Sequence, residues 1–319
     1  MASTDDMRLY KSPESYRIMT QFYENGLAKL GVDYESRFVP TRFGQTHLLA
    51  AGPEAAPPLI LVQGMAGSCI LWHRQLADFA RSRRVYALDT VGQPGRSAPN
   101  PPSLFDDGYA RWLVDVLDAL QLERADFAGV SLGGWAIIYL GILAPDRLRK
   151  AVLLSPMGLA RGKMHIRRWI PNPTRKDPGD TDLEARLQKR SFNPSASSDG
   201  RAYDQQLARA MALATKHYRV DLSMGIRPEQ SRAGKLWTGA RVLMKFMRPI
   251  PLRDLRRFAG PALLILGEHE VLYDPQASVR RAQSAMAALT AVIVPGAGHA
   301  AMYDKPEVVN PLILKYLQD

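Results

Sequence analysis

The chain has 319 residues, of which 46% are hydrophobic, and a formal net charge of +11. Its single cysteine excludes an internal disulfide framework, its polar and acidic start is unlike a signal peptide, and no apolar run approaches the roughly 20 residues that span a bilayer. We therefore expect a soluble cytoplasmic protein with no integral membrane association, built as one large domain or a domain with a sizeable insertion.

Apolar residues at helical spacing over residues 8–30 predict a helix before the core, and residues 37–41 and 45–50 predict a β-hairpin. Short apolar runs without alternation follow, as is typical of strands buried on both faces. These runs cover residues 59–62, 85–88, 125–128, 151–154, 262–266 and 291–294. Helical stretches alternate with them at residues 71–79, 109–120, 132–143, 276–288 and 306–317. This alternation predicts an α/β fold, a doubly wound and mostly parallel sheet flanked by helices.

The alternation breaks once, between Pro156 and Gly260. The intervening stretch is rich in proline and has no convincing strand, so we interpret residues 157–259 as an inserted helical cap. Residues 1–156 and 260–319 form the predicted core. Residues 157–258 contain 22 Lys and Arg but nine Asp and Glu, whereas the remainder contains 20 and 22. The excess positive charge therefore lies in the cap.

A G-x-S-x-G motif, Gly129-Val130-Ser131-Leu132-Gly133, lies between a predicted strand and a predicted helix. In this context the motif predicts a nucleophile elbow, a turn so sharp that glycines must flank it and the serine hydroxyl is exposed above the sheet. Ser131 is therefore the candidate nucleophile.

A serine hydroxyl needs a general base, and the chain offers six histidines. His299 stands in a glycine-rich loop after the last predicted strand, from which an imidazole can reach over the sheet edge, and we predict it to be the base. His269 directly follows a predicted strand, and the carboxylates in the same loop are stronger candidates for a catalytic role than this histidine. For the other four we expect surface or packing roles; they are His47, His73, His165 and His217.

An acidic residue that orients the base is expected on a loop after an earlier strand. The loop after residues 262–266 supplies Glu270 as first choice and Asp274 as the alternative acid, whereas Glu268 is interpreted as a turn residue. Asp89, after another strand, is expected to accept hydrogen bonds within a turn.

The developing oxyanion needs two backbone N–H donors, and the residue after the nucleophile, Leu132, supplies one. The loop after the first parallel strand supplies the other, with Met65 best placed. The remaining predicted pocket residues are Gln63, Gly64, Trp169 and Trp237.

Five short motifs together resemble the α/β-hydrolase superfamily over almost the whole chain. They are the elbow, Gln63-Gly64, Asp89-x-x-Gly92, Gly267-Glu268-His269-Glu270 and Gly298-His299. Residues 41–47, 52–58 and 267–275 more narrowly resemble the Bacillus carboxylesterases of the naproxen esterase (carboxylesterase NP) group. The resemblance implies Ser131, His299 and Glu270 as the catalytic triad and Met65 with Leu132 as the oxyanion donors. Three departures are Gln63 in place of the usual histidine, a loop after Asp89 that is one residue longer, and the cap. The cap diverges most, so the resemblance does not imply a particular substrate.

These observations predict a serine carboxylic-ester hydrolase that acts on a small-molecule ester through an acyl-enzyme, without a metal or an organic cofactor. The positive charge of the cap has several interpretations: it attracts an anionic substrate, an acyl carrier or a membrane surface, or it only keeps the cap solvated. No recognised motif supports nucleic-acid binding. Alternative functions are a thioesterase acting on acyl-carrier or CoA substrates, a carbon–carbon hydrolase or cyclase of natural-product metabolism, and a non-catalytic ligand-binding protein.

Overall fold

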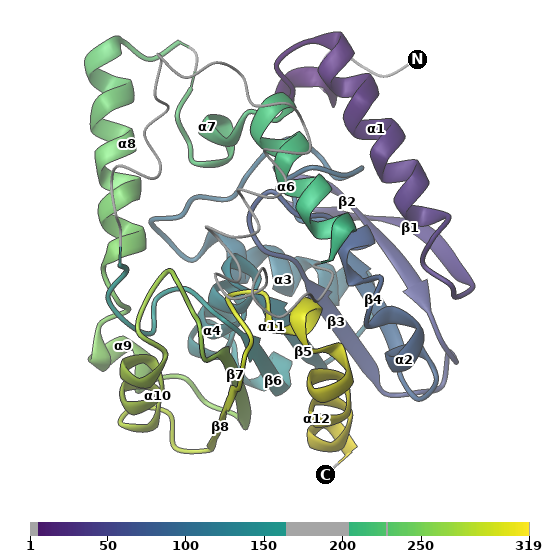
Figure 1. Ribbon diagram of the computed structural model, residues 1–319, viewed down its shortest axis with the longest axis vertical. Helices are drawn as coiled ribbons and strands as arrows, with labels where there is room; N and C mark the ends of the chain where they lie inside the picture. The colour runs from purple at the N-terminus through teal and green to yellow at the C-terminus, as the bar shows by residue number, and fades with distance from the viewer. Residues whose placement is uncertain (1–5, 164–203, 228, 319) are drawn as a thin grey trace.

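In the computed structural model, which describes residues 6–163, 204–227 and 229–318, the strands form one eight-stranded sheet (Figure 1). The strands are β1 (Tyr34–Thr41), β2 (Gly44–Ala51), β3 (Pro58–Val62), β4 (Arg84–Leu88), β5 (Ala125–Val130), β6 (Leu148–Leu154), β7 (Ala262–Gly267) and β8 (Leu289–Val294). Their order is β1-β2-β4-β3-β5-β6-β7-β8. Strand β2 pairs antiparallel with β1 and with β4, and all other neighbours are parallel. The predicted α/β fold with a mostly parallel sheet is confirmed.

Helices cover both faces of this sheet. The α-helices are α1 (Pro13–Leu27), α2 (Leu76–Ala80), α3 (Gly108–Ala119), α4 (Leu132–Leu143), α6 (Gln205–His217), α7 (Val220–Ser223), α8 (Arg232–Met247), α9 (Leu252–Leu255), α10 (Pro275–Gln283), α11 (Ala301–Asp304) and α12 (Pro306–Gln318). Short 3₁₀ helices are η1 (Asp6–Leu9), η2 (Cys69–Trp72) and η3 (Pro145–Arg147). In the described residues, no helix combines the length and the apolar character needed to cross a membrane.

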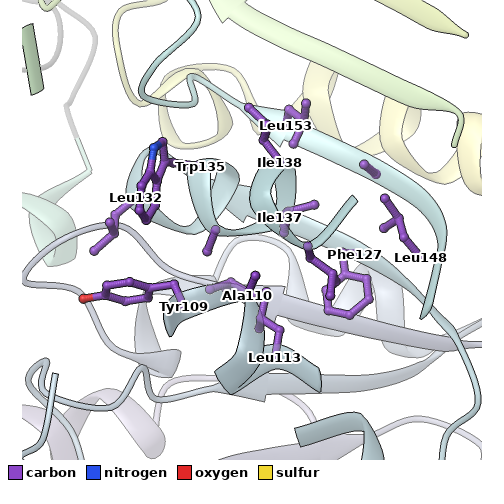
Figure 2. Packing of buried hydrophobic residues seen from close by; sticks show 14 of the residues in the cluster. Tyr109, Ala110, Leu113, Phe127, Leu132, Trp135, Ile137, Ile138, Leu148 and Leu153 are labelled. Carbon is purple, nitrogen blue, oxygen red and sulfur yellow. The ribbon is translucent and has the colours of Figure 1, made fainter. Parts of the chain in front are cut away.

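Alternate residues of each central strand enter different cores, which explains why the strands are apolar throughout. In β3, Ile60 and Val62 pack with α3 and α4, whereas Leu59 and Leu61 pack with α1, α2 and α12. Figure 2 shows the first core, where the α3 and α4 side chains meet Phe127 of β5. Both cores exclude water, so the sheet is a rigid platform for the loops at its edge.

Three helix predictions need correction. In the stretch 8–30, η1 ends at Leu9 and α1 spans only Pro13–Leu27. The stretch 71–79 is not one helix, because η2 ends at Trp72 and α2 begins at Leu76. Between them, the fully buried Gln75 donates from Nε2 to the Met302 carbonyl at 2.8 Å, a tertiary bond that a local pattern does not reveal. Helix α10 ends at Gln283 rather than continuing to residue 288.

The segment between β6 and β7 contains α6 to α9, with no strand in its described residues. Helix α6 and the turn after it pack on the N-terminal region, where Leu213 and Tyr218 join Leu9, Tyr10 and Met19 in a separate apolar cluster. Figure 1 shows α6 beside α1 and α8 along the outer edge of the molecule. The predicted core and cap boundaries at residues 156/157 and 259/260 stay a prediction.

Candidate active site

The turn between β5 and α4 has the backbone geometry of an elbow. Ser131 has φ +51° and ψ −106°, in a region that non-glycine residues rarely enter. A Cβ on Gly129 would lie 2.6 Å from the Gly133 carbonyl carbon, and one on Gly133 would lie 2.2 Å from the Val62 oxygen. Both flanking positions therefore require glycine, because any side chain would drive α4 away from β3 and β5.

The loops after β7 and β8 bring Glu270 and His299 together. Glu270 Oε2 lies 2.7 Å from His299 Nδ1, and both side chains are buried. A Cβ on Gly267 would lie 2.0 Å from the Gly298 oxygen, so glycine allows the two loops to touch. Because β5, β7 and β8 are parallel, Ser131, Glu270 and His299 all follow carboxyl ends at the same edge of the sheet.

The surroundings of Glu270 favour its ionised form. Burial alone raises the pKa of this carboxyl, but the neighbouring His299, the Leu272 N–H at 2.9 Å and the Ser155 side chain lower it, and the pKa lies below its usual range. The Tyr273 ring packs edge-on to the His299 imidazole with centroids 6.3 Å apart. An ionised carboxylate thus holds one ring nitrogen while an aromatic wall fixes the plane of the ring.

The alternative acid has a different partner. Asp274 is the N-cap of α10, and its Oδ1 accepts from the N–H groups of Gln276 at 2.9 Å and Ala277 at 3.2 Å. Glu268 accepts from the Gly296 N–H at 2.9 Å, as its turn assignment suggested. The local contacts therefore pair Glu270 alone of these three carboxylates with His299.

The loop after β3 lies against the elbow. A Cβ on Gly64 would lie 3.4 Å from the Ser131 Cβ, so this backbone faces the candidate nucleophile closely. Leu132 is the first residue of α4, where N–H groups have no partner within the helix. Two backbone segments, residues 63–66 and 131–132, thus converge beside Ser131.

Two glutamines hold this loop in place. Gln63 is buried, and its Nε2 donates to the Tyr303 hydroxyl at 3.1 Å. Gln93 accepts at Oε1 from the Ala66 N–H at 2.8 Å, next to Met65. Ala66 itself has φ +61°, so the loop is under strain at this residue. Gln63 therefore supports the loop, and its place in a substrate pocket stays a prediction.

Gln93, Ser155 and Tyr273 were missed by sequence reasoning. Gln93 lies in the lengthened loop after Asp89, and that extra residue was the available signal. Ser155 follows β6 with φ +43°, and its position at a strand end could have marked it. Nothing in the local sequence distinguishes the tyrosine.

Asp89 accepts backbone hydrogen bonds beside the same region, in keeping with its predicted role in a turn. It is fully buried, accepts from the N–H groups of Cys69 at 2.8 Å and Arg96 at 3.0 Å, and lies 2.8 Å from His47 Nδ1. The ligand-type atoms of His47, Cys69 and Asp89 lie within 4.8 Å of one another. The Tyr23 hydroxyl lies 2.7 to 3.2 Å from an atom of each. This geometry is that of a hydrogen-bonded network.

The remaining predicted residues lie elsewhere. His73 pairs with Asp204 at 2.9 Å and His217 contacts Ser15 at 3.1 Å, in keeping with packing roles. His269 is partly exposed beside Glu268. Trp237, expected in the pocket, is instead 67% exposed on α8, because that face of the helix points away from the core. His165 and Trp169 lie outside the described residues.

Apolar side chains do gather around the elbow. Met65, Met157 and Leu272 are partly buried and pack on the core cluster that contains Leu132 and Trp135. The Met157 N–H donates to the Ser131 carbonyl at 3.2 Å, which places this residue beside the elbow. The surroundings of the candidate nucleophile are therefore apolar on several sides.

Comparison with known proteins identifies the family of this chain. Residues 59–312 match the model of the alpha/beta hydrolase family. The chain is 30% identical to the uncharacterized carboxylesterase nap of Bacillus subtilis over 93% of this chain and 91% of that protein. The crystal structure of carboxylesterase CesB (YbfK) from Bacillus subtilis is similar with a TM-score of 0.77, at 28% identity and with 95% and 98% of the two chains covered.

The crystal structure of naproxen esterase (carboxylesterase NP) from Bacillus subtilis is equally similar. Its TM-score is 0.77 at 27% identity, with 96% of this chain and 99% of that chain covered. The family match covers residues 59–312, and the similarity to these esterases extends over nearly the full length of the chain. The chain therefore belongs to the alpha/beta hydrolase family and is a hydrolase similar to the Bacillus carboxylesterases.

Proposed function

We propose that the protein is a serine carboxylic-ester hydrolase with Ser131, His299 and Glu270 as its triad. The observation that carries the proposal is the buried 2.7 Å contact between Glu270 and His299, at the sheet edge where the strained Ser131 turn also lies. The carboxylesterase names of the relatives support an ester as the substrate.

In the proposed reaction, an Nδ1–H bonded to Glu270 leaves His299 Nε2 unprotonated, so it can take the proton of the Ser131 hydroxyl. The serine oxygen attacks the ester carbonyl and forms a tetrahedral intermediate. Collapse expels the alcohol, which receives the proton from His299, and leaves an acyl-serine. Water then attacks with His299 again as base, which releases the acid and restores Ser131.

The intermediate carries its negative charge on the former carbonyl oxygen. We assign the N–H groups of Leu132 and Met65 as its donors, supported by the approach of residues 63–66 to the elbow. Backbone donors leave the Met65 side chain available to line the acyl pocket, together with Met157 and Leu272. Ionised Glu270 would stabilise the imidazolium that forms during attack.

A matched series of oxyesters and thioesters, assayed at low and high salt, tests this function. We expect the wild type to cleave oxyesters with little salt dependence and Ser131→Ala to lose about 10⁶-fold in kcat. Exposed Ser284→Ala is the matched control, since it removes a hydroxyl from the end of α10. Thioester preference abolished by salt would indicate a carrier-dependent thioesterase, and retained activity in Ser131→Ala would contradict the triad.

A further inference from the structure

Helix α8 exposes an apolar face. Within α8, which is described throughout, Val242 alone is buried, whereas Leu236 is 77% and Met244 46% exposed, and the exposed Trp237 lies between them. Together with Ala233 and Ala240, these residues follow helical spacing and form one stripe. A helix on the surface of a globular protein normally turns such a stripe toward the core.

The opposite side of α8 packs on the rest of the protein, where Val242 is buried in the first core and Phe246 packs against it. Two cations of the helix also contact aromatic rings. The Lys245 Nζ lies 5.6 Å from the Trp135 ring centroid and the Arg241 guanidinium lies 4.5 Å from that of Phe105. These contacts orient the helix with its long basic side chains against aromatic rings. The apolar stripe therefore points outward at the edge of the molecule, where Figure 1 shows α8.

Basic residues flank the stripe. Exposed Arg232 lies at one border and exposed Arg248 at the other, when the helix is viewed down its axis. Arg241 lies next to Arg248 on the side that contacts Phe105. Residues 232–247 include two Arg and two Lys but no Asp or Glu. An apolar stripe bordered by guanidinium groups is the pattern of a helix that lies in a lipid headgroup region.

A cavity continues the stripe at the end of α8. It has a volume of about 420 Å³ and is lined by Arg161, Met244, Met247, Arg248 and Pro249. Its walls are thus two thioethers and a proline ring, with a guanidinium from each of two chain segments. This combination suits an acyl chain whose negatively charged headgroup stays at the two arginines.

We propose that the outer face of α8 docks on the surface of an anionic lipid bilayer. Leu236, Trp237 and Met244 enter the boundary between headgroups and acyl chains, and Arg232 and Arg248 bind lipid phosphates. Charge favours this occupant, since residues 157–258 have 22 basic and nine acidic residues, against 20 and 22 elsewhere. A nucleic acid would match the charge but leave the apolar stripe without a partner.

This docking needs no catalytic group, so it goes beyond the proposed function and is tested separately. Wild type and Ser131→Ala are sedimented with vesicles of phosphatidylcholine alone and of phosphatidylcholine mixed with phosphatidylglycerol. We expect both proteins to bind the anionic vesicles and neither to bind the neutral ones. Trp237 emission should shift to shorter wavelength on binding, and Trp237→Phe should remove that shift while it preserves binding.

Variants separate the apolar from the electrostatic part. Leu236→Ser combined with Trp237→Ser should lower the partition coefficient more than about tenfold, because two exposed apolar side chains no longer enter the bilayer. Arg232→Gln should lower it about fivefold, the effect of one basic residue near an anionic surface. Val308→Ser on α12 and exposed Arg124→Gln are matched controls that should bind like wild type.

Thermal unfolding of each variant verifies that the fold persists. Equal binding to neutral and anionic vesicles, or no binding to either, would overturn the proposal. So would binding that the Leu236→Ser and Trp237→Ser pair leaves unchanged, because charge attraction alone would then account for it. A wild type that elutes as a dimer, with α8 variants that elute as monomers, would assign the stripe to a second copy of the chain.

Discussion

The carboxyl edge of the sheet and helix α8 differ in how far their side chains are buried. At the sheet edge, Glu270 and His299 are buried, paired with each other and held by loops whose glycines permit backbone contact. On α8, Val242 is the one buried residue, and Leu236, Trp237 and Met244 are exposed. The proposed triad needs a fixed geometry and lies at the edge of a sheet with a core on each face, whereas the proposed docking surface lies on an exposed helix between β6 and β7.

The largest test of this contrast concerns the two carboxylates after β7. Glu270→Gln should lower kcat about 10⁴-fold, because an amide cannot hold the Nδ1–H tautomer or stabilise an imidazolium. Asp274→Asn should stay within a few-fold of wild type, since asparagine still caps α10. Steady-state kinetics on one oxyester decides, and the reverse ranking would exchange the roles of the two residues.

The next largest effect is the difference in unfolding free energy between a core and a surface Leu→Ala substitution. Leu264→Ala, in the centre of β7 and fully buried, should lower the free energy of unfolding by about 2 to 5 kcal/mol. Leu236→Ala on α8 should change it by less than about 0.5 kcal/mol. Urea denaturation measures both. A large loss for Leu236→Ala would mean that its side chain is buried in solution, which would break the contrast.

The inserted segment is nevertheless anchored at Asp204, the N-cap of α6. Burial raises the pKa of this carboxyl, but His73, Arg74 and the Leu207 N–H together lower it to about 2. A lowered pKa adds stability above the ordinary aspartate pKa, and this contribution is lost as the pH falls toward 2. At pH 7 it amounts to about 2 kcal/mol.

Asp204→Asn should therefore lower the free energy of unfolding at pH 7 by about 2 kcal/mol, and the difference from wild type should shrink below about pH 4. Denaturant titrations across this pH range measure the effect. Exposed Asp33→Asn removes a carboxylate without this network and serves as control. A difference that stays constant with pH would show that the anchor is not ionic.

The smallest effect is expected around the loop after β4, where the turn after α6 contacts the core. The Tyr218 hydroxyl donates to the Gly92 carbonyl at 2.6 Å, next to Gln93, which accepts from the Ala66 N–H. Gln93→Ala leaves that N–H without its acceptor and should lower kcat about tenfold with little change in KM.

Gln93→Glu keeps an acceptor oxygen and should recover most of the rate, whereas Gln283→Ala on the exposed face of α10 should match wild type. If thermal unfolding shows that the Gln93 variants are as stable as wild type, the loss of kcat reflects the position of the loop and not a loss of folded protein. A rise in KM with unchanged kcat would place Gln93 against the substrate instead of behind the loop.

Much of the fold could be predicted because the central strands are buried on both faces and therefore apolar without interruption. The elbow was also predictable, since Gly129 and Gly133 are required by contacts within one strand–turn–helix unit. The broken helix around Gln75 was not, since the bond that Gln75 makes there is to Met302, more than 200 residues away in the chain. The exposure of Trp237 was equally hidden, since apolar spacing does not say which way a stripe points.

The sequence by itself thus determined the parallel sheet, the Ser131 turn and the candidate residues after each strand, because these depend on local steric demands and on burial pattern. Tertiary structure decided which carboxylate meets His299. Glu270 and Asp274 are four residues apart and chemically alike, yet one contacts the imidazole and the other caps α10. It also decided that the Leu236 side of α8 faces outward, because Val242 and Lys245 on the opposite side of that helix contact the core.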